Sequence, residues 1–174
     1  MSKVIPEKVN DYRVYPNGST DLRGVADLQL PSFDAMTESI TGAGIIGEYE
    51  AANYGHFGSM KLTLNWRMIT GELTEFLKPE ALQLDCRIVN QEYAVAAANH
   101  AFTPQRVLVK GQVIKNDLGK VAKGSGYEGS TEIEVTYIKL EREGKTIVEL
   151  DKMNYIYVVD GIDYMKKIRE GLGL

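Results

Sequence analysis

The chain has 174 residues, of which 44% are hydrophobic and 25% charged, and its formal net charge at pH 7 is −4. This balance is typical of one globular domain with its own core, and the lack of a dense lysine and arginine cluster argues against tight nucleic-acid binding. No apolar run reaches the length of a signal-peptide core or of a membrane-spanning helix, so we expect no membrane anchor.

Two short extended segments, residues 11–19 and 21–31, open the predicted fold, because each is bounded by proline or glycine. Residues 32–58 differ from them, since they contain five glycines and show no convincing hydrophobic period. An irregular connection much longer than about 15 residues is uncommon in a compact domain. We therefore predict that this glycine-rich loop has a function of its own.

Residues 60–68 alternate strictly between apolar and polar side chains, which predicts a strand with one buried face. A short helical pattern follows, in which Leu73 and Phe76 share a face. Thr70 is its expected N-cap and Pro79 its expected stop.

Three further stretches alternate in the same way and predict most of the remaining sheet. Residues 81–95 and 105–120 are each expected to form one long strand, and residues 130–161 two or three more. Residues 142–145 have the composition of a tight hairpin turn. With about seven or eight strands against two helices, the fold class is mainly β.

The C-terminal helix is the more strongly patterned of the two helices. Asp160 is placed to cap it and Asp163 to lie in its first turn. Its apolar stripe consists of Ile162, Met165, Ile168 and Leu172. We expect this helix to pack against an open edge or end of the sheet structure.

Few residues of this chain suggest catalysis. Cys86 is the only cysteine, which excludes an intrachain disulfide, and it alternates in phase with Leu84 and Ile88 as a small core residue would. The two histidines, His56 and His100, have no metal-ligand or catalytic spacing around them, and we interpret His56 as a turn residue. Three acidic pairs at i, i+2 are expected to project into solvent: Glu48 and Glu50, Glu132 and Glu134, and Glu141 and Glu143. The prediction is a protein that is not an enzyme and has no cofactor and no metal site.

The segment 41–50 contains a complete G-x-G-x-x-G motif in Gly42, Gly44 and Gly47. A dinucleotide loop of that spelling lies between a buried strand and a helix N-terminus, and neither flank fits here. The motif encloses Ile45 and Ile46, a β-branched pair that a solvated loop would expose. Such a composition is typical of an arm that becomes ordered on a partner.

The stretch 153–159 is apolar on both faces of the strand that it predicts. A strand in an isolated sandwich normally has one wet face, so something must cover the second one. Either the C-terminal helix or another copy of the chain could do so.

The order of these motifs resembles that of the major tail tube proteins of contractile-tailed phages. The resemblance extends from about residue 12 to residue 174, and its most specific parts are the motifs TGAGIIGEYE, LTLNWR and DGIDYMKKIREGLGL. It implies an antiparallel β-sandwich or barrel with a flanking helix, and no cofactor. Gly42, Gly44, Ile45, Ile46 and Gly47 would then form an intersubunit contact within the loop at about residues 32–58.

The resemblance also implies a set of partners. Proteins of this family form hexameric rings, stack them into the inner tube of the tail, and meet the sheath, tape-measure, baseplate and tail terminator proteins. DNA passes through the lumen without tight binding, and an acidic lumen would repel its backbone. Such a protein is made and assembled in the host cytoplasm and ends in the virion.

Two alternatives stay open at this point. The same architecture serves the tube of an R-type bacteriocin or of a related contractile injection system, which carries no genome. A protein of another class, a nucleotide- or ligand-binding β-domain, would instead use the loop from Gly42 to Gly47 for its ligand.

Overall fold

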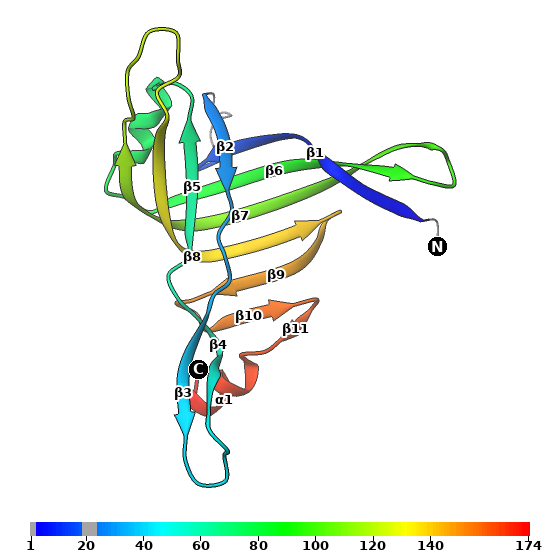
Figure 1. The fold of residues 1–174 in the computed structure, drawn as a ribbon, viewed down its shortest axis with the longest axis vertical. Coiled ribbons are helices and arrows are strands. Elements are labelled where there is room, and N and C mark those ends of the chain that lie inside the picture. The colour runs from blue at the N-terminus through cyan, green and yellow to red at the C-terminus, as the bar shows by residue number, and fades with distance from the viewer. Residues whose placement is uncertain (1–2, 19–23) are drawn as a thin grey trace.

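The computed structural model describes residues 3–18 and 24–174, and these form a mainly β structure with two short helical elements (Figure 1). The elements are β1 (Val4–Pro16), β2 (Val25–Gln29), β3 (Ala35–Thr41), β4 (Glu48–Phe57), β5 (Lys61–Trp66), the 3-10 helix η1 (Gly71–Phe76), β6 (Leu82–Ala94), β7 (Asn99–Asp117), β8 (Gly129–Arg142), β9 (Lys145–Asp151), β10 (Ile156–Val159), β11 (Ile162–Asp163) and α1 (Lys166–Leu172). The mainly β, antiparallel fold class with a C-terminal helix is confirmed. The predicted extended segment 21–31 lies partly outside the described residues, and its remainder contains β2.

Nine of the strands form one antiparallel sheet, in the order β1-β6-β7-β8-β9-β10-β11, with β5 on β8 and β2 on β5. Strand β8 has β7 along one side, whereas its other side pairs first with β5 and then with β9. The sheet therefore folds over itself along β7 and β8. Register shifts in β7 next to Gly111 mark the bend. A Cβ at Gly111 would lie 2.0 Å from the carbonyl oxygen of Glu134, so the two strands can approach this closely only at glycine.

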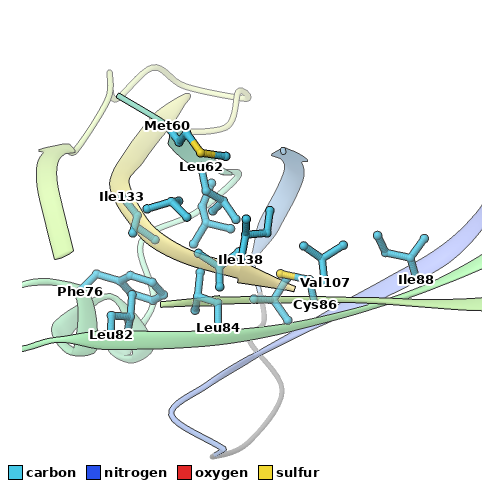
Figure 2. Close-up of a cluster of buried hydrophobic side chains, with 14 of the residues drawn as sticks. Met60, Leu62, Phe76, Leu82, Leu84, Cys86, Ile88, Val107, Ile133 and Ile138 are labelled. Carbon is cyan, nitrogen blue, oxygen red and sulfur yellow. The ribbon is translucent and has the colours of Figure 1, made fainter. Parts of the chain in front are cut away.

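The core lies in the fold of this sheet, between β5 and η1 on one side and β6 to β8 on the other (Figure 2). The predicted alternation of β6 is confirmed, because Leu82, Leu84, Cys86 and Ile88 are all buried there. Trp66 packs edge-on against Phe76, and its indole N–H donates to the buried hydroxyl of Thr131 at 2.9 Å. Burial raises the pKa of the Cys86 thiol to about 12, as suits an inert core residue.

Several predicted boundaries are corrected by the structure. The strand predicted over 60–68 ends at Trp66, and Met68 is exposed. The internal helix is a single 3-10 segment, and Thr70 lies at its N-cap position without a capping hydrogen bond from its side chain. The tight turn at 142–145 is confirmed, since Glu143 and Gly144 both have positive φ there.

The largest correction concerns residues 32–58, which are not an irregular loop. They contain the antiparallel pair β3–β4, a separate two-stranded sheet in which Ile40 faces Tyr49 and Thr41 faces Glu48. The alternation of β3 was missed because every one of its residues is exposed, so no apolar face had to be maintained. His56 belongs to β4 and is not a turn residue.

The predicted C-terminal helix is present, but it is shorter than expected. Helix α1 has only seven residues, and Asp160 lies before β11 at a positive φ rather than at a helix cap. Of the predicted stripe, Met165 is buried, whereas Ile162 and Leu172 are exposed. The strand predicted over 153–159 is shortened to β10, because residues 152–155 form a turn closed by the side chain of Asp151.

Candidate assembly surfaces

The β3–β4 hairpin projects from the body of the molecule, at the bottom of Figure 1, and carries the glycine motif at its tip. We define the hairpin tip as residues 42–47. Gly42, Gly44 and Gly47 all have positive φ, which lets the chain reverse where other residues would be strained. Ile46 is fully exposed, with a relative accessibility of 107%, and Ile45 is partly exposed. All five predicted contact residues therefore lie together on one projecting turn.

The shaft of the hairpin has two different faces. Residues paired across the strands share a face, which puts Ile40 and Tyr49 on one side, and both are exposed. The opposite side carries hydroxyls and carboxylates, among them Ser39, whose hydroxyl donates to Glu48. No lysine or arginine occurs from residue 25 to residue 60, while the hairpin region contains Asp34, Glu38, Glu48 and Glu50. The hairpin is thus an acidic arm with an apolar tip, and one face carries Ile40 and Tyr49 beside Glu38.

The foot of the hairpin is fixed to the body by aromatic contacts. Phe57 packs edge-on against Phe33 at 5.7 Å and against Tyr157 of β10 at 5.0 Å between ring centroids. Tyr164 contacts both Tyr157 and Tyr54. The hairpin foot therefore packs against the Tyr157 side of β10, the side that also meets the core. An anchored foot with an exposed tip gives an arm of defined direction.

A second projection, which we call the lateral arm, consists of residues 4–9, 89–95 and 99–104. Here β1, β6 and β7 run beyond the core as a three-stranded ribbon, at the right of Figure 1. The ribbon exposes six apolar side chains: Val4, Ile5, Val9, Val89, Val95 and Phe102. Among the described residues, no strand pairs with the outer side of β1 at residues 4–9, so this stretch is a free edge that can offer its backbone groups to another strand. The sequence analysis missed this surface, because it predicted no strand over residues 4–9 or 99–104, which show no alternation of apolar and polar side chains.

The sheet face opposite the core is charged rather than apolar. Asp85 is only 7% exposed there and accepts hydrogen bonds from Arg106 and Arg87. Although burial raises the pKa of Asp85, these hydrogen bonds outweigh it and hold the pKa below its usual value. Of the acidic pairs predicted to be solvated, Glu132, Glu134 and Glu141 instead pair with lysine or arginine side chains.

The structure gives the glycine motif no nucleotide-binding geometry, because it joins two antiparallel strands and precedes no helix. Over residues 3–18 and 24–174, no group of three or more histidine, cysteine, aspartate or glutamate side chains could hold a metal ion. The helices within the same ranges are too short and too polar to cross a bilayer. Apolar side chains displayed on projecting arms are characteristic of a protein that associates with other molecules.

The chain belongs to the phage tail tube protein FII family, whose model matches residues 6–173. It is similar to the major tail tube protein of Serratia phage KSP20, with 26% identity over 171 residues and 98% of both chains covered. It is also similar to the tail tube protein of Escherichia phage P2, with 32% identity over 68 residues, which are 39% of this chain and 40% of the relative. The resemblance drawn from the sequence motifs is confirmed.

Proposed function

We propose that this protein is the non-enzymatic subunit of a contractile tail's inner tube, which forms hexameric rings that stack into a conduit for the genome. The observation that carries the proposal is the hairpin tip, where Ile46 is fully exposed on an arm whose foot is fixed. A β-branched apolar side chain held away from the core gains burial only against another molecule. The family membership supports the same conclusion.

The lateral arm supports assembly in a second direction. The hairpin and the lateral arm leave the body at different places and point in different directions (Figure 1). A ring needs one heterologous contact between neighbours, and a stack of rings needs another along the axis. The free edge of β1 supplies a template for the first contact and the hairpin tip for the second.

The remaining partners follow from the place of a tube in a tail. The sheath would surround it, the tape-measure protein fill it, and the baseplate and tail terminator proteins bound its two ends. The chain would be assembled in the host cytoplasm and would end in the virion tail. The net charge of −4 on each copy would repel a DNA backbone within about 8 Å at physiological salt, so that DNA slides past without tight binding.

Both named relatives come from phages, which favours a genome conduit over the tube of an R-type bacteriocin or related injection system. The hairpin geometry at Gly42 and Gly47 favours an assembly role over the ligand-binding alternative.

The deciding experiment compares the wild-type chain with the double variant Ile45→Asp, Ile46→Asp by negative-stain electron microscopy and light scattering over a concentration series. We expect hollow tubes of uniform diameter from the wild type and only folded monomers from the variant, with unchanged thermal unfolding, because both side chains lie outside the core. The variant Met153→Asp, at an exposed turn, is the control and should still form tubes. A variant that fails to fold would contradict the assignment of the tip.

A further inference from the structure

The hairpin tip and a second loop lie at opposite ends of the molecule's longest axis. This second loop joins β7 to β8 and stands at the top of Figure 1, whereas the hairpin tip is at the bottom. We call residues 118–127 the distal loop. Any stack of copies along this axis, in one orientation, brings the hairpin tip of one copy toward the distal loop of the next.

The distal loop is held at its base by close backbone contacts. The amide of Lys120 donates to the carbonyl of Tyr127 at 2.6 Å, and the amide of Tyr127 donates to that of Arg67 at 3.0 Å. A Cβ on Gly119 would lie 1.9 Å from the Tyr127 carbonyl oxygen, so only glycine allows this closure. The loop therefore presents its outer residues from a fixed base.

Those outer residues are apolar and basic. Val121 is 78% exposed and Leu118 is 53% exposed, although neither is needed by the core. Lys120 and Lys123 are also exposed, and residues 118–127 contain no carboxylate side chain. Asp117 and Glu128 flank the loop at its base, where the Asp117 carboxylate accepts a hydrogen bond from the backbone amide of Gly119. The projecting part of the loop thus has a charge of +2 next to two exposed apolar side chains.

The hairpin has the complementary character. Its tip displays Ile45 and Ile46, and the shaft immediately behind carries Glu48 and Glu50 with no basic residue nearby in the sequence. Each end alone exposes apolar side chains to water, which is unfavourable in free energy. When the two ends meet, these side chains are buried and charges of opposite sign come close together.

We propose that the distal loop of one copy receives the hairpin tip of a second copy, with Ile45 and Ile46 against Leu118 and Val121. Glu48 and Glu50 then lie close to Lys120 and Lys123. This contact rests on the proposed tube function and identifies the receiving surface, which is part of the same chain. Because the two surfaces differ, the contact is heterologous and repeats from copy to copy without closing.

Disulfide cross-linking tests the contact directly. The chain carrying Ile46→Cys and Val121→Cys is oxidised under conditions in which the wild type forms tubes, and the products are separated under denaturing conditions. A heterologous contact gives a ladder of trimers and longer chains, while a mixture of the two single variants gives dimers only. The native Cys86 does not interfere, since it is fully buried. The matched control pairs Ile46→Cys with Val95→Cys, which lies at the turn of the lateral arm and should give no ladder.

The outcomes separate this inference from the proposed function. Tubes with a ladder support both. Tubes without a ladder, dimers of Ile46→Cys alone, or a ladder with the Val95→Cys control overturn the receiving surface and leave the tube function standing. A ladder without tubes supports the contact and overturns the tube. If the chain forms neither tubes nor a ladder, the receiving surface and the tube function are both overturned.

Charge reversal supplies an independent measurement of the same contact. We expect Lys120→Glu with Lys123→Glu to raise the critical concentration for assembly by about tenfold or more, and Glu48→Lys with Glu50→Lys to do the same. The four changes combined should restore assembly toward the wild-type value. Lys166→Glu with Lys167→Glu on α1 is the control for net charge and should have little effect. No recovery in the combined variant would overturn the pairing of these charges.

Discussion

At the scale of single residues, the glycines of this chain have two different physical roles. A Cβ at Gly42, Gly44 or Gly47 would meet no atom within 4 Å, so these residues serve the positive φ of the tip. Gly111 lies instead where two strands touch, with Glu134 O 2.0 Å and Ile133 Cγ2 3.2 Å from the position of a Cβ. The three glycines of the tip shape a surface, whereas Gly111 permits the bend of the sheet.

The variant Gly111→Ala tests the second role. We expect a loss of about 2 kcal/mol or more in the free energy of unfolding, because overpacking costs ~1–3 kcal/mol and here the clash is with backbone. Urea denaturation followed by circular dichroism measures it. Gly71→Ala is the matched control, since its Cβ would meet nothing within 4 Å, and equal stability of the two variants would contradict the account.

Asp85 gives the fold a dependence on acid. Its pKa is lower in the folded than in the unfolded chain, so it contributes stability above its unfolded pKa, and this contribution is lost as the pH falls through the folded value. We expect the free energy of unfolding to fall below about pH 4, and to fall less steeply in Asp85→Asn. Urea denaturation from pH 7 to pH 3 checks this, and parallel curves for the two proteins would contradict it.

At the scale of elements, the sequence predicted best those strands that bury one face. The alternation of β6 identified Leu84 and Cys86 as core residues, because burial enforces a period of two. The β3–β4 hairpin was missed because it buries neither face within one copy. The tip residues were still predicted to form an intersubunit contact, because an apolar pair among glycines is unusual in a solvated loop, and that contact stays a prediction. The lateral arm was missed because residues 4–9 bury no face within one copy and therefore keep no apolar period.

Met165 links α1 to the hairpin, and its truncation tests how the arm is held. It is buried against Gly55, beside a cavity of about 150 Å³ at the hairpin foot. We expect Met165→Ala to enlarge this cavity, to cost about 2–4 kcal/mol in local stability, and to speed amide exchange in β4. Hydrogen exchange measured by mass spectrometry reports on it. Leu172→Ala, at an exposed position of the same helix, should leave β4 unchanged.

At the scale of the whole molecule, the folded body provides stability and its projections provide the surfaces for assembly. The bent sheet supplies a closed core, and the hairpin, the lateral arm and the distal loop carry apolar residues that this core does not need. Surface substitutions on the projections should therefore change assembly without changing the stability of the monomer.

Phe102→Glu tests this division on the lateral arm. Phe102 is 58% exposed, so we expect the free energy of unfolding of the variant to lie within about 0.5 kcal/mol of the wild-type value. We also expect that the variant no longer forms rings. Analytical ultracentrifugation and electron microscopy measure the assembly. Met153→Glu is the matched control at an exposed turn, and rings formed by Phe102→Glu would remove the lateral arm from the ring contact.

The position of the aromatic residues has an optical consequence. The chain has a single tryptophan, Trp66, which is enclosed by the core and bonded to Thr131, while Tyr49 and Tyr54 stand exposed on the hairpin. Tryptophan emission should thus stay unchanged while copies associate and should change only when the core unfolds. Tyrosine absorbance should respond at the moment the hairpin leaves water. Two wavelengths on one unlabelled sample can then follow unfolding and polymerisation separately, in real time.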